Sequence, residues 1–98
     1  GYKISLGKNE KANAYLLKNA KMSDIWLHLK DLPSTHVIIS SNKKDIPKKV
    51  LEFAANICVK FSVAQKSDYL VDYTTRRNVK IVSGAKVNYV NYKTLRVK

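Results

Sequence analysis

The segment Asp24–Ser40, DIWLHLKDLPSTHVIIS, contains the side chains of this sequence that are best suited to chemistry. It holds the single Trp and both His residues of the chain. Apolar residues alternate there with Trp26, His28 and Lys30, which predicts a strand with one aromatic and cationic face. Aromatic rings stack on bases and cations bind phosphates, so this face indicates a nucleic-acid surface.

The segment reads as two strands, Asp24–Lys30 and Thr35–Ser40, joined by a tight turn. Asp31 and Pro33 are typical turn residues, and we expect them to shape this connection. Two interpretations of Trp26 stay open, because a Trp is as well suited to a protein core as to a stacking platform for bases.

His28, Asp31 and His36 resemble a sparse metal site, but no Cys pair, HExxH motif or carboxylate cluster accompanies them. We therefore expect no metal and no other cofactor. Asp31 is expected to hydrogen-bond the turn or one imidazole, and the two His residues have either structural or RNA-contacting roles. The sequence also lacks a Gly-rich phosphate loop and a GxSxG motif, so we expect no enzyme and no small-molecule substrate.

Two further groups of polar and basic residues are candidates for phosphate contact. The first follows the strand expected at residues 69–74, where Arg side chains suit bidentate binding and Lys side chains act as point charges. A solvated loop is the alternative interpretation of this group. The second lies at the start of the first helix, where free backbone N–H groups attract anions. The candidates are Tyr73, Arg76, Arg77, Lys80 and Lys86 in the first group, and Lys8, Asn9, Lys11 and Asn13 in the second.

The composition predicts one basic, folded domain over residues 1–98. The hydrophobic share is 45%, and 19 Lys and Arg residues against 7 acidic residues give a net charge of +12. This charge favours a nucleic-acid partner. No apolar run approaches the ~18 residues of a membrane span, and the N-terminus does not read as a signal peptide. Gly1 in place of an initiator Met indicates a domain excised from a longer protein.

Periodicity predicts an α+β fold, in which two α-helices pack on one face of a largely antiparallel (mixed) β-sheet. Asn9 is expected to cap a helix that runs to about Ala20 and buries Ala12, Tyr15, Leu16 and Ala20. Pro47 is expected in the first turn of a longer helix, which should fade between Ala64 and Ser67. The expected strands cover residues 2–6, 24–30, 35–40, 69–74, 79–82, 86–90 and 94–97.

The sequence resembles the NFACT-R domain family over nearly its whole length. The main match is the family signature, and weaker matches lie near both ends of the chain. Ser34 and the pair Val87-Asn88 depart from the family pattern, which has Gly and Pro-Gly at these positions. The signature matches are Asp24, Trp26, His28, Lys30, Asp31, Pro33 and His36, and the weaker ones are Gly7-Lys8-Asn9 with Asn13, Val71-Asp72-Tyr73-Thr74, Asn78-Val79-Lys80 and Gly84-Ala85-Lys86.

The resemblance implies a cytoplasmic RNA-binding domain of a protein that acts in ribosome-associated quality control. Its expected partners are tRNA, large-subunit rRNA and other domains of the parent protein, with no membrane partner. The residues expected to contact RNA are Trp26, His28, Lys30 and His36 of the signature, together with the two groups of polar and basic residues named above, whereas Asp31 and Pro33 are expected to shape the turn. Some bacterial members are labelled fibronectin-binding proteins, so the resemblance also implies an alternative function as a surface adhesin domain.

Overall fold

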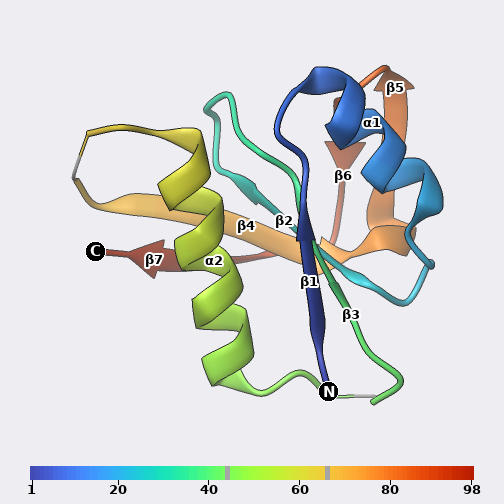
Figure 1. Ribbon diagram of the computed structural model, residues 1–98, viewed down its shortest axis with the longest axis horizontal. Helices are drawn as coiled ribbons and strands as arrows, with labels where there is room; N and C mark the ends of the chain where they lie inside the picture. The colour runs from blue at the N-terminus through green and yellow to red at the C-terminus, as the bar shows by residue number, and fades with distance from the viewer. Residues whose placement is uncertain (44, 66) are drawn as a thin grey trace.

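The computed structural model describes residues 1–43, 45–65 and 67–98. Each predicted helix and strand is present, and a short 3-10 helix is added after the fourth strand (Figure 1). Lys66, within the interval where we expected the second helix to fade, lies outside the described residues. The elements are β1 (Lys3–Leu6), α1 (Glu10–Asn19), β2 (Ile25–Leu29), β3 (Val37–Ser40), α2 (Lys48–Ser62), β4 (Tyr69–Thr75), η1 (Arg76–Asn78), β5 (Val79–Ser83), β6 (Lys86–Tyr89) and β7 (Lys93–Val97).

Five strands form one sheet in the order β1-β3-β2-β4-β7, and β5 and β6 form a separate hairpin. Every pairing among them is antiparallel. The α+β class and the antiparallel sheet are therefore confirmed. No helix among the described residues is long and apolar enough to cross a membrane.

The larger hydrophobic core lies between α2 and one face of the sheet. Leu27 and Leu29 alternate with polar neighbours along β2, so both side chains point toward α2. Ala54, Ala55 and Cys58 meet them from the helix and are buried.

A second core lies on the opposite face of the sheet, beneath α1 and the β5–β6 hairpin. Leu17 of α1 packs there with Trp26 of β2 and Val79 of β5. The prediction that both helices share one face was therefore wrong. The physical reason is that the Trp26 face is apolar over part of its area and must itself be covered.

The buried side of α1 also differs from the predicted stripe. Asn13 and Leu17 are its buried residues, whereas Tyr15 is 71% exposed. The helix is thus rotated by about one residue, because the polar Asn13 lies inside the fold and bonds to β3. The predicted cap is confirmed, since the Asn9 side chain accepts a hydrogen bond from the Ala12 N–H at 2.8 Å.

The two departures from the family signature do not produce strained turns. Among the described residues, positive φ angles occur only at Asp31, Gly84 and Asn91. Ser34, which stands where the family has Gly, is not one of them. Its hydroxyl instead accepts a hydrogen bond from the Leu29 N–H at 3.0 Å, which closes the turn between β2 and β3. The left-handed φ of 56° at Asp31 supports the predicted turn role of this residue.

Candidate nucleic-acid interface

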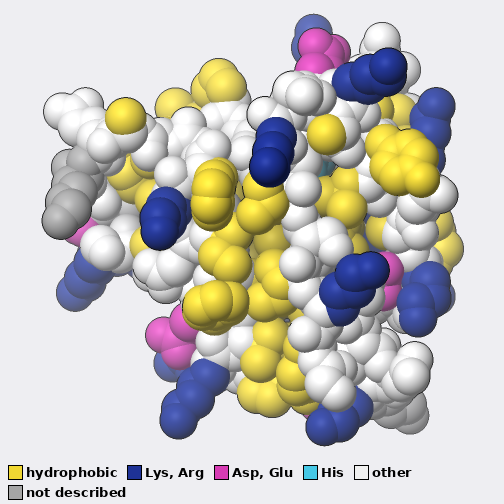
Figure 2. Space-filling model, viewed as in Figure 1, with side chains coloured by type: hydrophobic (Ala, Val, Ile, Leu, Met, Phe, Trp, Pro, Cys, Tyr) yellow, Lys and Arg dark blue, Asp and Glu magenta, His cyan; other side chains and the backbone are white. Residues whose placement is uncertain are grey.

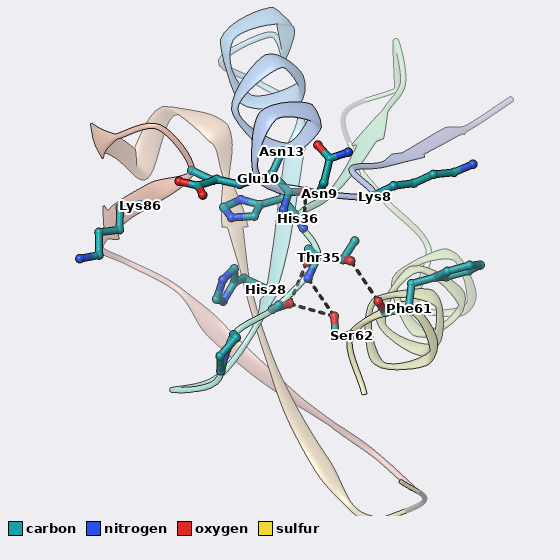
Figure 3. A pocket seen from close by; sticks show the side chains of 13 residues that line it. Lys8, Asn9, Glu10, Asn13, His28, Thr35, His36, Phe61, Ser62 and Lys86 are labelled. Carbon is teal, nitrogen blue, oxygen red and sulfur yellow. Dashed lines mark hydrogen bonds between the residues drawn. The ribbon is translucent and has the colours of Figure 1, made fainter. Parts of the chain in front are cut away.

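The structure brings residues from separate parts of the sequence into one open groove of about 430 Å³. Its walls are the start of α1, the β2–β3 connection, the end of α2 and the β5–β6 turn (Figure 3). We call it the histidine groove, because both His residues line it. The predicted RNA-binding residues that it gathers are Lys8, Asn9, Asn13, His28, His36 and Lys86.

The start of α1 forms the cationic wall of the histidine groove. Lys8 is exposed and extends outward on one side, and Lys86 extends outward on the other (Figure 3). The free N–H groups of the first helical turn add partial positive charge between them. Glu10 is the acidic side chain of the lining, and the turn residue Gly84 packs against it.

Gly7 lets β1 approach α1 closely enough to form this wall. A Cβ atom at this position would lie 2.7 Å from the backbone N of Asn13, which no side chain tolerates. Asn13 uses the close approach to accept a hydrogen bond from the His36 N–H at 3.1 Å. The Gly-Lys-Asn motif with its following Asn thus has a structural explanation: it fastens the helix start to β3.

The two His rings that line the groove form a cluster with the Trp26 ring beneath them. The Trp26 Nε1–H donates to His36 Nδ1 at 2.9 Å, so the proton of the neutral His36 ring is on Nε2. His28 stacks on Trp26, with ring centroids 5.5 Å apart, and its edge-on contact with His36 is 4.9 Å. Trp26 is fully buried and His36 is 2% exposed, whereas His28 is only half-buried. Of the three rings, His28 is the one available to a ligand.

The environment of this cluster lowers the pKa of both imidazoles. Burial, and next the neighbouring His28 ring, lower the pKa of His36 from 6.5 to about 4. Burial also lowers the pKa of His28, against the opposing effects of the Leu29 carbonyl and Asp72. Both rings are therefore neutral near pH 7. The His28 Nδ1–H donates to the Leu29 carbonyl at 2.6 Å, so the Nε2 atom of the neutral ring is a hydrogen-bond acceptor. His28 therefore offers the groove an acceptor at this pH, rather than a charge.

This arrangement predicts that acid destabilises the domain. The unfolded chain takes up a proton at His36 below pH 6.5, whereas the folded chain does so only near pH 4. We expect the free energy of unfolding to fall across this window by up to about 1.4 kcal/mol per pH unit. Urea denaturation at a series of pH values measures this slope. The variant His36→Asn keeps a hydrogen-bond acceptor for Trp26 but does not titrate, so an unreduced slope in that variant would contradict the prediction.

Lys30 lies outside the groove and is already partnered. Its Nζ is 3.5 Å from the buried Asp72 carboxylate and 4.8 Å from the centroid of the Tyr92 ring. Asp72 also accepts hydrogen bonds from the Tyr89 and Thr94 hydroxyls. Tyr92 is 43% exposed, and it is not among the residues predicted from the sequence to contact RNA. An aromatic residue beside Lys93 in a short turn is the signal that would have identified it.

Four of the predicted RNA-contacting residues are buried, and their assignment as contacts is corrected. Trp26 is covered by α1 and the hairpin, so no base reaches its faces. The other three are Asn13, His36 and Arg76, whose polar atoms bond within the protein. The hydrogen bonds of Asn13 and His36 are described above. Arg76 is 7% exposed and donates to the carbonyls of Leu17 and Val79. Within this group the sequence could not separate internal hydrogen bonding from ligand binding.

The remaining predicted contacts divide between the two sides of the sheet. Tyr73 is half-buried against the larger core, on the α2 side, and therefore does not face the groove. Lys11, Arg77 and Lys80 are exposed but do not line the groove. Pro33 lines it next to the His pair. No three His, Cys, Asp or Glu side chains gather in a metal-binding arrangement within residues 1–43, 45–65 and 67–98.

Comparison with known proteins identifies the family. The family model of the NFACT protein RNA binding domain matches residues 1–89. The chain belongs to this family. Among solved structures, the C-terminal part of the fibronectin/fibrinogen-binding protein from Streptococcus suis has the same fold, with a TM-score of 0.87 and 34% identity. The alignment covers 98% of this chain and 40% of that one.

Curated relatives of this NFACT domain come from bacteria and animals. The chain is 44% identical over 94 residues to the Rqc2 homolog RqcH of Bacillus subtilis, covering 94% of this chain and 16% of the relative. It is 31% identical over 97 residues to the coiled-coil domain-containing protein 25 of Bos taurus, covering 93% and 47%. The chain therefore spans less than half the length of these relatives.

Proposed function

We propose that this chain is the RNA-binding domain of a ribosome-associated quality control factor, and that the histidine groove receives the phosphate backbone of tRNA or large-subunit rRNA. The observation that carries the proposal is the convergence of the start of α1, the His pair and the β5–β6 turn on one groove. Membership of an RNA-binding family and similarity to an Rqc2 homolog support it. The proposed place of action is the cytoplasm, alongside other domains of the parent protein.

The charge distribution supports contact with phosphates rather than reading of a base sequence. Lys and Arg side chains ring the face seen in Figure 2, where acidic side chains are sparse. Among the 19 basic residues, only Arg76, Arg77 and Arg96 are Arg, and Arg76 is buried. Lys binds phosphate as a point charge, whereas Arg is the usual reader of base edges. The domain is thus suited to the shape and backbone of a structured RNA.

Within this proposal the groove residues have distinct roles. Lys8, Lys86 and the first N–H groups of α1 bind phosphate oxygens. The half-buried His28 ring accepts a hydrogen bond from a ribose hydroxyl, because its Nδ1–H is already bonded to the Leu29 carbonyl. Outside the groove, Tyr92 is held beside Lys30 and takes the stacking role predicted for Trp26, because its ring is partly exposed.

The test is the double variant Lys8→Ala with Lys86→Ala. We expect an affinity for bulk tRNA about tenfold lower than that of the parent chain, and a slope of log affinity against log salt reduced by about 1.5 to 2. Fluorescence anisotropy with labelled tRNA at several salt concentrations measures both quantities. The matched control is Lys49→Ala with Lys60→Ala, two exposed cations of α2 away from the groove. Equal losses in the two double variants would contradict the assignment of the groove.

A specific observation also favours a second candidate function. The similar solved structure belongs to a protein described as binding fibronectin and fibrinogen. A domain of net charge +12 is suited to acidic surfaces of such proteins as well as to RNA. Surface plasmon resonance on immobilised fibronectin tests this candidate. Saturable binding that persists in the presence of excess tRNA is the result expected of an adhesin, and its absence removes the adhesin function.

A further inference from the structure

The outer edge of β7 borders a second groove, on the α2 side of the sheet. This groove, of about 410 Å³, lies between α2 and β7 and shares no lining residue with the histidine groove. β7 is the last strand of the five-stranded sheet, so among the described residues no strand pairs with its outer edge. It also lies beyond residues 1–89, which the family model matches. The RNA-binding description therefore does not assign it.

The strand alternation shows which backbone groups this edge offers. The Lys30 N–H donates to the Leu70 carbonyl, and the Arg76 N–H donates to the Asp24 carbonyl. The even-numbered residues of β4 therefore bond to β2, and the odd-numbered ones bond to β7. Their partners in β7 are residues 93, 95 and 97. The N–H and C=O groups of Thr94 and Arg96 consequently point away from the sheet, free to pair with another strand.

The groove beside this edge suits the side chains of an added strand. Leu95 and Val97 point toward α2, and Ala55 forms the opposite wall with a side chain small enough to leave space. A strand paired with β7 would place alternate side chains over these three residues. The charges along this edge are mostly positive. Lys48 and Lys98 line the groove with the acidic residue Glu52, and the Arg96 side chain, which alternates with Leu95 and Val97, points to the other face of β7.

We propose that this groove binds an extended acidic segment of a partner protein, which adds to β7 as a sixth strand. The positive charge at this edge favours an acidic partner over a second copy of the chain. A second copy of this chain would bring Lys93 and Arg96 against their own equivalents, and both copies carry a charge of +12. Cationic side chains at an edge strand oppose such self-pairing. An acidic segment meets the same cations with the opposite charge while satisfying the free backbone groups.

The test uses the heptapeptide EVEVEVE, with blocked ends, as the probe. Amide NMR spectra of the labelled chain should show saturable shifts at Thr94, Arg96 and Ala55, and slowed hydrogen exchange at Thr94 and Arg96. The peptide KVKVKVK should bind at least about tenfold more weakly, since its charges are repelled. Two N-methylated versions of EVEVEVE separate strand pairing from charge attraction. Methylation along one edge of the peptide should abolish binding, and methylation along the other edge should leave it unchanged.

A protein variant gives an independent readout. Arg96→Pro removes one outward N–H at an edge position that tolerates Pro, and Arg96→Ala removes only the charge. We expect the Pro variant to lose about tenfold more affinity for EVEVEVE than the Ala variant. The proposal would be overturned if the two methylated peptides bound equally well, if KVKVKVK bound as tightly as EVEVEVE, or if the shifts lay outside the groove. The proposal would also be overturned if tRNA, but not EVEVEVE, shifted the signals of Thr94 and Arg96, since the groove would then belong to the RNA surface.

Discussion

Replacing Trp26 with Ala is expected to lower the free energy of unfolding by about 4 kcal/mol, because a large, fully buried aromatic side chain is lost from the core. Its ring fills the space between Leu17, Ile38 and Val79, and packs against Tyr89 with ring centroids 4.7 Å apart. The change also leaves His36 Nδ1 without the donor that satisfies it. A loss of this size is a large part of the stability of a small domain.

Urea denaturation followed by circular dichroism measures this loss without relying on Trp fluorescence. Tyr15→Ala is the matched control, since Tyr15 is an aromatic residue that is 71% exposed. We expect that variant to change the stability by less than about 0.5 kcal/mol. The variant Trp26→Phe retains most of the packing and should keep RNA affinity at the parent level. An unchanged urea midpoint for Trp26→Ala would show that the ring is not a core residue.

Arg76→Ala is expected to cost about 3 kcal/mol of stability, whereas Arg77→Ala is expected to cost less than about 0.5 kcal/mol. The Arg76 side chain donates to the Leu17 carbonyl at 2.8 Å and to the Val79 carbonyl at 2.7 Å. It therefore joins the end of α1 to the start of the hairpin. Its removal takes the side-chain donor from the Val79 carbonyl, leaves the Leu17 carbonyl with only the longer 3.4 Å hydrogen bond from the Ala20 N–H, and opens a cavity around them. The Arg77 side chain is exposed, so each variant is the other's control.

Thermal and urea unfolding of both single variants check this difference. These two variants also test the sequence-based hypothesis that both Arg residues bind phosphate together. Because Arg77→Ala is expected to remain folded, its affinity for RNA reports directly on phosphate contact by Arg77. Equal stability of the two variants would show that the hydrogen bonds of Arg76 carry no net free energy.

The sequence predicted the elements of this fold well because local patterns determine them. Alternating residues marked the strands at residues 2–6 and 24–30, and Asn9 marked the start of α1 through a hydrogen bond that spans three residues. The arrangement of the helices was not predicted. It depends on Trp26 and Ile38, which make the second face of the sheet apolar, and alternation alone does not say which face a helix covers.

The sequence indicated several residues that lie close together in space, but not which of them have partners inside the fold. Some residues that the sequence grouped as basic or aromatic do meet in space. The polar atoms of Asn13, His36 and Arg76, however, are hydrogen-bonded to backbone groups or to a ring within the protein. Such partners are distant in the sequence: Arg76 and Leu17 are 59 positions apart. A polar residue satisfied within the fold and one that awaits a ligand have the same local pattern, and only the three-dimensional contacts separate them.

The β5–β6 hairpin has a consequence for how the domain moves. It pairs with itself and not with the five-stranded sheet, and it is held by Arg76, by Val79 in the second core and by the Tyr89 hydroxyl on Asp72. A unit that lies outside the hydrogen-bonded main sheet opens locally at a lower free energy than the strands of that sheet. Because its turn supplies Lys86 to the histidine groove, a ligand bound there would hold the hairpin shut. Slowed hydrogen exchange in β5 and β6 would then report occupancy of the groove from a distance.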